Sequence, residues 1–268
     1  MPADLEPDCV LDRVYYIFLK KWSIRGSSLH CWSSADDLSN MHKHSAKEIR
    51  FEVSKKAGSV SGLLLFPTEA KSLLILSHGA GAGMRHVFMQ NIAEKLADNG
   101  IATLRYQFPY MEKGIKRPDS EALLTASVRG AVTAAQEHAN GLPLFAGGKS
   151  MGGRMTSLAA AQAPLNDVRG LIYLGFPLHA AGKPSADRAD HLFDIKLPML
   201  FLQGSRDALA DLNLLKPLCA RLGKRVELFV IEGGDHSFHL LKSSGRSDDQ
   251  ALDQAGLKVS SWISRVLK

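Results

Sequence analysis

The chain has 268 residues, of which 45% are hydrophobic and 22% are charged, so a disordered or fibrous protein is excluded and the length suits one α/β domain. The formal net charge is +6, and the basic residues are scattered rather than gathered in runs, which argues against a nucleic-acid-binding arm. No apolar run approaches the roughly 18 residues that span a bilayer, and no secretory signal is recognisable, so we expect no membrane association.

Between Trp22 and Asn40 the sequence shows neither a sustained hydrophobic period nor a helix-capping signal, and Met41 stands just before the first predicted strand. We therefore expect residues 1–40 to form an N-terminal appendage that is dispensable for the fold and the chemistry, followed by a domain over residues 41–268. The domain opens with two runs of alternating apolar and polar residues, 49–53 and 60–66, on either side of Ala57-Gly58. This pattern predicts an antiparallel hairpin at a sheet edge.

The rest of the chain alternates between short apolar runs and segments with helical periodicity. Strands are predicted at residues 72–76, 101–106, 144–147, 170–174, 199–203 and 226–231. Helices are predicted from Phe88 to Gly100, then at residues 120–139, 152–163, 214–222 and 252–266. Such alternation is typical of βαβ units, so the predicted fold class is α/β with a doubly wound, mostly parallel sheet.

A G-x-S-x-G motif stands between a predicted strand and a predicted helix, as Gly148-Lys149-Ser150-Met151-Gly152. In this setting the serine occupies a strained turn that needs small residues two positions before and after it, and Gly148, Gly152 and Gly153 meet this need. The motif predicts that Ser150 is a nucleophile projecting from the carboxyl edge of the sheet. The alternative is an ordinary glycine-rich turn.

A serine nucleophile needs a histidine base and a carboxylate that orients it, and these follow the serine in the order Asp, His on this kind of sheet. Asp207 and His236 each follow a predicted strand and are our candidates. Asp211 and His239 remain as competitors, although Asp211 is well placed to begin a helix and His239 lies in an apolar stretch where we expect it to be packed.

The oxyanion of a tetrahedral intermediate needs two N–H donors. Met151, directly after the predicted nucleophile, supplies one. The second is expected from Ala80 or Gly81 in the glycine-rich loop at residues 77–83, where the backbone approaches a ligand closely. We assign His78 a supporting role in hydrogen bonding rather than proton transfer.

Over about residues 47–268 the sequence resembles the α/β-hydrolase superfamily. The resemblance is carried by His78-Gly79, the motif from Gly148 to Gly153, Asp207, and Gly234-Asp235-His236. The segments Phe108-Pro109-Tyr110-Met111-Glu112 and Gly175-Phe176-Pro177-Leu178-His179 are similar to a small, cap-less, dienelactone-hydrolase-like group. The resemblance implies hydrolysis through an acyl-serine intermediate without a metal or organic cofactor. Residues 175–198 are too few for the large lid of many relatives, which implies an open site.

The expected substrate is a small acyl compound such as an ester or thioester, in a pocket lined by residues of two strand-end loops: Phe108, Tyr110, Met111, Phe176 and His179. A set of basic residues around it attracts an anionic substrate or is ordinary solvated surface: Lys113, Lys116, Arg117, Lys149, Arg154 and Lys183. The rival hypothesis is a non-catalytic binding or scaffolding protein that retains the fold.

Three cysteines bear on the compartment of the protein. Cys9, Cys31 and Cys219 show no C-x-x-C spacing, so the sequence predicts neither a disulfide framework nor a zinc site. A reducing cytoplasm is the expected location.

Overall fold

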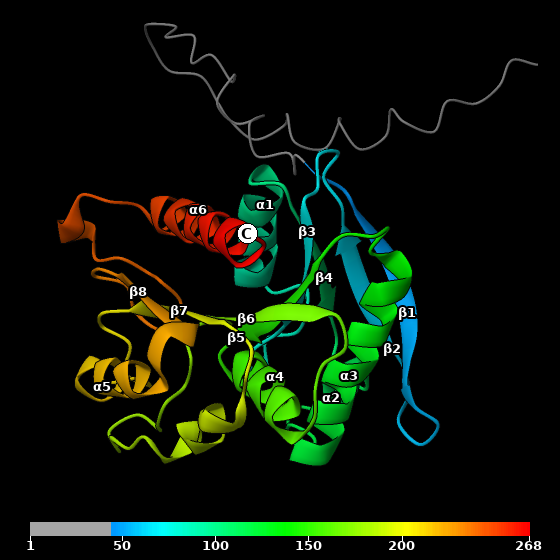
Figure 1. Ribbon diagram of the computed structural model, residues 1–268, viewed down its shortest axis with the longest axis horizontal. Helices are drawn as coiled ribbons and strands as arrows, with labels where there is room; N and C mark the ends of the chain where they lie inside the picture. The colour runs from blue at the N-terminus through cyan, green and yellow to red at the C-terminus, as the bar shows by residue number, and fades with distance from the viewer. Residues whose placement is uncertain (1–43) are drawn as a thin grey trace, which may run out of the picture. The chain divides into compact units, whose positions relative to one another are not determined.

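The computed structural model describes residues 44–268 (Figure 1). The expected appendage at residues 1–40 lies outside the described residues, as do Cys9 and Cys31, whereas Cys219 is a buried free thiol. Within residues 44–268 no helix is long and apolar enough to cross a membrane, and no group of three or more His, Cys, Asp or Glu side chains is arranged to hold a metal ion.

One eight-stranded sheet organises the domain, in the order β1-β2-β4-β3-β5-β6-β7-β8. The strands are β1 Ala46–Ser54, β2 Gly58–Leu65, β3 Ser72–Ser77, β4 Ile101–Tyr106, β5 Leu144–Lys149, β6 Val168–Leu174, β7 Met199–Gly204 and β8 Val226–Ile231. β1 and β2 form the antiparallel hairpin at one edge, and β2 also runs antiparallel to β4. All the other neighbours are parallel, so the carboxyl ends of β3 to β8 meet along one edge of the sheet.

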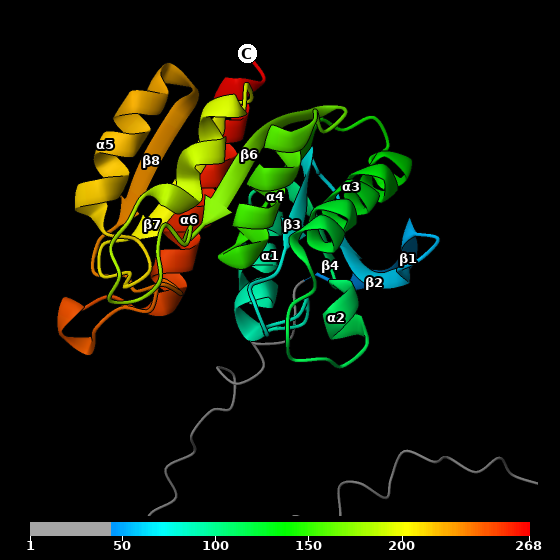
Figure 2. The ribbon, with the colours of Figure 1, turned by 90° about the horizontal axis from the view of Figure 1, so that it is seen from below.

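Helices cover both faces of the sheet (Figures 1 and 2). The α-helices are α1 Val87–Asp98, α2 Pro109–Glu112, α3 Glu121–His138, α4 Met151–Gln162, α5 Leu212–Leu222 and α6 Asp248–Val266. Short 3-10 helices occur at η1 Asp187–Asp194, η2 Gly223–Arg225 and η3 Lys242–Ser244. α1 and α6 pack on one face, whereas α3, α4 and α5 pack on the other.

This double cover explains why the central strands are apolar throughout. Successive side chains of β3 point to opposite faces of the sheet, so Leu73 and Ile75 join the core beneath α3 and α4, and Leu74 and Leu76 join the core beneath α1 and α6. All six residues of β3 are buried. A strand covered on one face would instead alternate apolar and polar residues.

The predicted α/β class, the doubly wound and mostly parallel sheet and the edge hairpin are confirmed. The segment between β6 and β7, residues 175–198, contains only the short helix η1, so the expected absence of a large cap also holds for the described chain. Sequence periodicity missed α2 and η1. Both are too short to repeat a helical pattern, and α2 has four residues.

Candidate active site

Ser150 stands between β5 and α4 in a backbone conformation that is rare for a residue with a side chain. Its φ is +52° and its ψ is −120°, and its N–H donates to the Leu174 carbonyl at 3.1 Å. This hydrogen bond connects the turn to the end of β6. A strained backbone at one side chain is a feature of functional sites, and here it directs the hydroxyl away from the sheet at the carboxyl ends of the strands.

Glycines on both sides of Ser150 make this turn possible because the backbone of β3 passes very close to it. A Cβ on Gly148 would lie 2.9 Å from the Gly152 carbonyl carbon, and one on Gly152 would lie 2.6 Å from the His78 carbonyl oxygen. Real Cβ atoms do not approach this closely, so both positions require glycine. The small residues that the motif predicts are therefore needed for packing space as well as for the turn.

His236 lies beside Ser150, although the two residues are far apart in the sequence. Its Nε2 is 2.8 Å from Ser150 Oγ, and its Nδ1 is 2.7 Å from Asp207 Oδ2. Because an ionised carboxylate only accepts hydrogen bonds, Nδ1 carries the proton and Nε2 is left to accept the serine hydroxyl. The Asp207 side chain is fully buried, whereas that of His236 is 26% exposed. The hydrogen-bonded series Ser150–His236–Asp207 thus runs from a partly exposed serine to a buried carboxylate.

Three donors hold the Asp207 carboxylate. Besides His236, the N–H of Leu209 donates to Oδ1 at 2.8 Å and the side-chain amide of Gln203 donates to Oδ2. Gln203 lies in β7, is completely buried, and also accepts the N–H of Phe176 at 3.0 Å. The carboxylate is therefore both paired and fixed in orientation, which a buried charge requires.

The competing residues have other partners. Asp211 begins α5 and accepts the N–H of Asn213 at 2.8 Å, the expected capping role. His239 forms a 2.6 Å pair with Asp248, and the pKa of His239 is raised by that carboxylate. The side chain of His239 is 62% exposed, so the expectation that it is packed is wrong. Phe238 and Leu240 on either side of it are buried, and alternation in the loop turns His239 outward.

The loop after β3 lies beside Ser150, since a Cβ added to Gly79 would be 3.6 Å from Ser150 Cβ. The N–H of Gly81 donates to the Tyr110 hydroxyl at 3.0 Å and is thereby occupied. Among the hydrogen bonds of residues 44–268, none uses the N–H of Ala80 or of Met151, the first residue of α4. Of the two residues proposed for the second oxyanion donor, Ala80 is the one whose N–H is available.

His78 holds this loop in place through hydrogen bonds made in the protein interior. It is completely buried, its Nε2 accepts the N–H of Phe108 at 3.2 Å, and its Nδ1 donates to the Gly79 carbonyl at 2.7 Å. Burial lowers the pKa of His78 to about 4, which keeps the ring neutral. The residue joins the loops after β3 and β4, in agreement with its expected supporting role.

The family assignment follows from a match that spans most of the domain. Residues 70–264 match the family described as "Alpha/beta hydrolase domain". The chain belongs to this family. A Mycobacterium tuberculosis protein that carries the provisional name phosphoribosyl transferase is 29% identical over 195 residues, which are 70% of this chain and 42% of that protein. The chain thus spans less than half the length of this relative.

Solved structures show the same α/β-hydrolase fold. A dienelactone hydrolase from Anabaena variabilis aligns with a TM-score of 0.64 at 21% identity and covers 84% of this chain and 99% of its own. An α/β serine hydrolase without a lid from Xanthomonas campestris aligns with a TM-score of 0.60 at 20% identity, and the alignment covers 80% of this chain and 94% of that protein. Est1E from Butyrivibrio proteoclasticus aligns with a TM-score of 0.61 at 16% identity, and the alignment covers 82% of this chain and 98% of that protein.

The predicted lining of the substrate pocket is only partly compatible with the structure of this α/β hydrolase. Phe108 and Phe176 are 0% exposed and Tyr110 is 1% exposed, so these rings pack in the core and the expectation that they line an open pocket is wrong. His179 is 4% exposed, and its Nε2 accepts the N–H of Asp211 at 2.8 Å. It nevertheless lines a surface pocket together with Asp207 and Ala208, so it stays a candidate. Met111 is partly exposed and stays a candidate.

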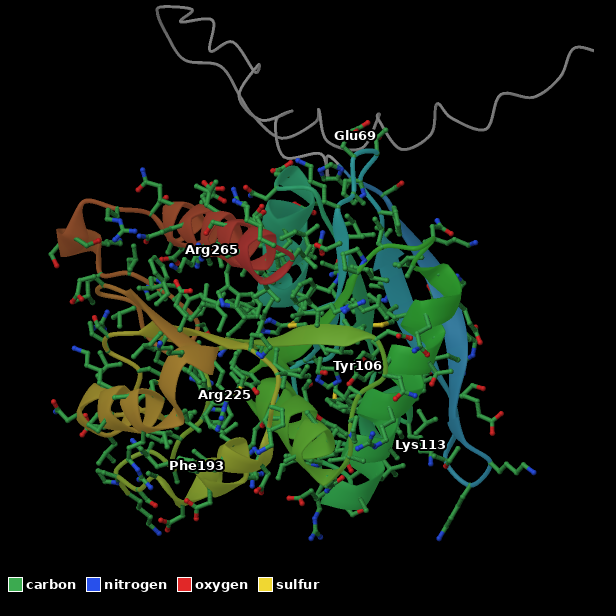
Figure 3. The ribbon with its side chains drawn as sticks, in the orientation of Figure 1. Glu69, Tyr106, Lys113, Phe193, Arg225 and Arg265 are labelled. Atoms are coloured by element: carbon green, nitrogen blue, oxygen red, sulfur yellow. The ribbon has the colours of Figure 1, made fainter. Side chains whose placement is uncertain are left out.

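The predicted set of basic residues around the site also agrees only partly with the structure. Lys113, Lys116, Arg117 and Lys183 are exposed, and Figure 3 shows Lys113 at the periphery of the domain whereas Tyr106 lies in its interior. Arg154 is partly buried. Lys149 is only 6% exposed and does not belong to any surface rim, because its side chain runs inward from the last position of β5.

Sequence reasoning also missed two polar groups that organise the site. Gln203 is the last residue but one of an apolar strand and lies four residues before Asp207, and a glutamine at such a place is a detectable signal. Beneath Ser150, the Ser77 hydroxyl contacts the Tyr106 hydroxyl at 2.7 Å and the Thr156 hydroxyl at 3.2 Å. This cluster joins β3, β4 and α4, and no sequence pattern indicates it because its members come from three distant segments.

Replacing Gln203 by glutamate is expected to destabilise the protein in a pH-dependent way. Gln203→Glu places a second carboxylate against Asp207 in a fully buried position, and an uncompensated buried charge costs about 3–5 kcal/mol. The loss is present at neutral pH and recovers as the pH falls toward about 4.3, because a protonated glutamate donates to Asp207 as the amide does. Urea unfolding at neutral and acidic pH measures this effect.

The matched control is Gln203→Met, which removes the amide without adding a charge. Its loss of stability relative to the unmodified protein should vary much less with pH. An equal pH dependence in both variants would mean that the residue at position 203 does not face the Asp207 carboxylate.

Proposed function

We propose that this protein is a serine hydrolase that cleaves a carboxylic ester, thioester or related acyl bond through an acyl-serine intermediate. The observation that carries the proposal is the continuous chain from Ser150 Oγ to His236 Nε2 at 2.8 Å and from His236 Nδ1 to Asp207 Oδ2 at 2.7 Å. A nucleophile, a base and an orienting carboxylate in this geometry are what acyl transfer requires.

In the acylation step, Ser150 Oγ attacks the carbonyl carbon of the substrate while His236 Nε2 takes the hydroxyl proton. Asp207 stabilises the imidazolium that forms but does not take its proton. The negative charge on the carbonyl oxygen is stabilised by the N–H groups of Met151 and Ala80. His236 then donates the proton to the leaving group, and the acyl group remains on Ser150.

In the deacylation step, His236 Nε2 takes a proton from a water molecule, which attacks the acyl carbon. The tetrahedral intermediate uses the same two N–H donors, and the proton returns to Ser150 Oγ as the carboxylic acid departs. The steps balance without an external electron donor or acceptor, and the residues named supply every proton transfer. The dienelactone hydrolase and the α/β serine hydrolase among the structural neighbours support this class of reaction.

Labelling with a fluorophosphonate probe tests the proposal directly. The probe phosphonylates an activated serine, so we expect one stoichiometric label on the unmodified protein and none on Ser150→Ala. Intact-protein mass spectrometry counts the label, and peptide mapping locates it. If the folded, unmodified protein takes up no label, the alternative of a binding protein that retains the fold is favoured instead.

A further inference from the structure

Lys149 immediately precedes Ser150 and its side chain enters the protein interior. Only 6% of the residue is exposed. Its Nζ donates to the backbone carbonyl of His236 at 2.6 Å and lies 5.4 Å from the centre of the Phe88 ring, an arrangement that favours a cation. One side chain therefore joins the nucleophile turn, the histidine loop and α1.

The structure leaves room for this side chain by placing glycine beside it. Gly175, at the end of β6, has a φ of +67°, and a Cβ there would lie 3.1 Å from Lys149 Nζ and 2.9 Å from the His236 carbonyl oxygen. The stem of Lys149 passes Gly79 in the oxyanion loop, where a Cβ would lie 3.7 Å from Cγ. The lysine thus occupies a channel between the loops that carry the three parts of the site.

Several hydrogen bonds shape the loop around His236, including those from the N–H of Asp235 to the His239 carbonyl at 3.1 Å and from the N–H of Phe238 to the Asp235 carbonyl at 3.0 Å. Asp235 accepts the N–H groups of Ser237 at 2.7 Å and His239 at 2.9 Å, which shapes the loop after the histidine. Phe238, with a φ of +65°, packs its ring 5.7 Å from that of Phe88. Among the described residues, the Lys149 ammonium supplies the hydrogen bond to the carbonyl of His236 itself.

A lysine is an expensive choice for a buried position. Burying an ammonium carries a large desolvation penalty, and an apolar side chain of the same length would fill the channel without that penalty. The charged groups that act on it are Asp207, from the loop after β7, and Asp235, from the loop after β8, and both favour the charged form. From α1 and the end of β6 the contacts are with Phe88 and Gly175, which do not titrate.

We propose that Lys149 is a positioning residue, whose ammonium group fixes the backbone of His236 so that the imidazole stays between Ser150 and Asp207. This inference rests on the proposed serine hydrolase function. The lysine touches no reacting atom; it acts through the carbonyl of the base. A hydrogen bond from a charged donor is stronger than one from a neutral donor, so the positioning weakens when the ammonium loses its proton.

Burial lowers the pKa of Lys149 to about 8, against the opposing effect of the two carboxylates. Below that pH the ammonium is charged and holds the histidine loop. Above it the neutral amine holds the loop less firmly. The rate of serine modification should therefore fall over the alkaline range in the unmodified protein, although general-base catalysis alone predicts a plateau there.

The test measures the rate of fluorophosphonate labelling from about pH 6.5 to about pH 9.5, a range that brackets the alkaline limb of a pH–rate profile. Three proteins are compared: the unmodified protein, Lys149→Met, which keeps the stem but not the charge, and Lys216→Met, which removes an exposed lysine on α5. Near neutral pH we expect Lys149→Met to label roughly ten- to a hundredfold more slowly, the range for a displaced catalytic group. Its alkaline fall should be absent, and Lys216→Met should match the unmodified protein.

The two hypotheses fail in different ways. If the unmodified protein is not labelled at Ser150, the proposed function fails. If it is labelled, and Lys149→Met either labels at the same rate or labels slowly but keeps the alkaline fall, the positioning role is overturned. Circular dichroism shows whether Lys149→Met folds. If it does not fold, two other results test the positioning role: the alkaline fall in labelling rate of the unmodified protein, and the shift of that fall to higher pH in Lys149→Arg. Absence of both would overturn the proposal.

Discussion

Replacing His236 by alanine is expected to lower kcat/KM for an activated ester such as p-nitrophenyl acetate by about 10⁴- to 10⁶-fold. Without the imidazole 2.8 Å from Oγ, no group accepts the proton of Ser150, and a serine hydroxyl is a weak nucleophile in its protonated form. The thermal unfolding midpoint should change little, because the imidazole is partly exposed and its main buried partner, Asp207, keeps two other donors.

The matched control is His239→Ala. His239 lies three residues further along the same loop, but it pairs with Asp248 and its side chain is 62% exposed, so its loss should leave kcat/KM within about twofold. The double variant Ser150→Ala/His236→Ala should be no less active than either single variant, because groups that act as one unit do not contribute additively. Retention of a tenth of the activity in His236→Ala would be incompatible with its role as the base.

The second large effect is expected at Gly152. In Gly152→Ala the new methyl group would lie 2.6 Å from the His78 carbonyl oxygen and closer still to that of Ser77. These atoms belong to the end of β3 and the loop after it, and β3 is held between β4 and β5, so the backbone has little freedom to move away. We expect the free energy of unfolding to fall by about 3 kcal/mol or more, since overpacking against backbone relaxes poorly.

Gly79→Ala is the control for this stability effect, because a Cβ there would meet nothing closer than 3.6 Å. Its free energy of unfolding should change by less than about 1 kcal/mol. Chemical denaturation of the two variants gives the comparison. An unchanged midpoint for Gly152→Ala would show that β3 and α4 are further apart than the structure indicates.

Patterns that depend on local sequence led to correct predictions. The strand at residues 101–106 has the predicted bounds, and the apolar run at 72–76 differs by one residue, because burial on both faces leaves a continuous apolar signal. The candidate site also follows from local patterns. Ser150, Asp207 and His236 each follow a strand, and parallel strands bring such positions to one edge.

Properties that depend on contacts between distant segments could not be predicted. The segment after β4 suggests a pocket lined by Phe108 and Tyr110, but Tyr110 lies in α2 and both rings pack against each other and His78 inside the core. Lys149 was expected at the surface because lysines are rarely buried. Its inward path depends on Phe88, Gly175 and His236, which are widely separated in the chain.

The position of β8 has a consequence for how the protein loses activity. Within residues 44–268, β8 pairs only with β7, five of its six residues are partly exposed, and the loop that follows it carries His236. An edge strand opens locally at a lower free energy than the central strands do. A brief detachment of β8 would withdraw the base while the turn at Ser150, anchored between β3 and β6, kept its shape. Inactivation on warming would then precede the collapse of the sheet and would reverse on cooling, so loss of activity and loss of the fold are separate events.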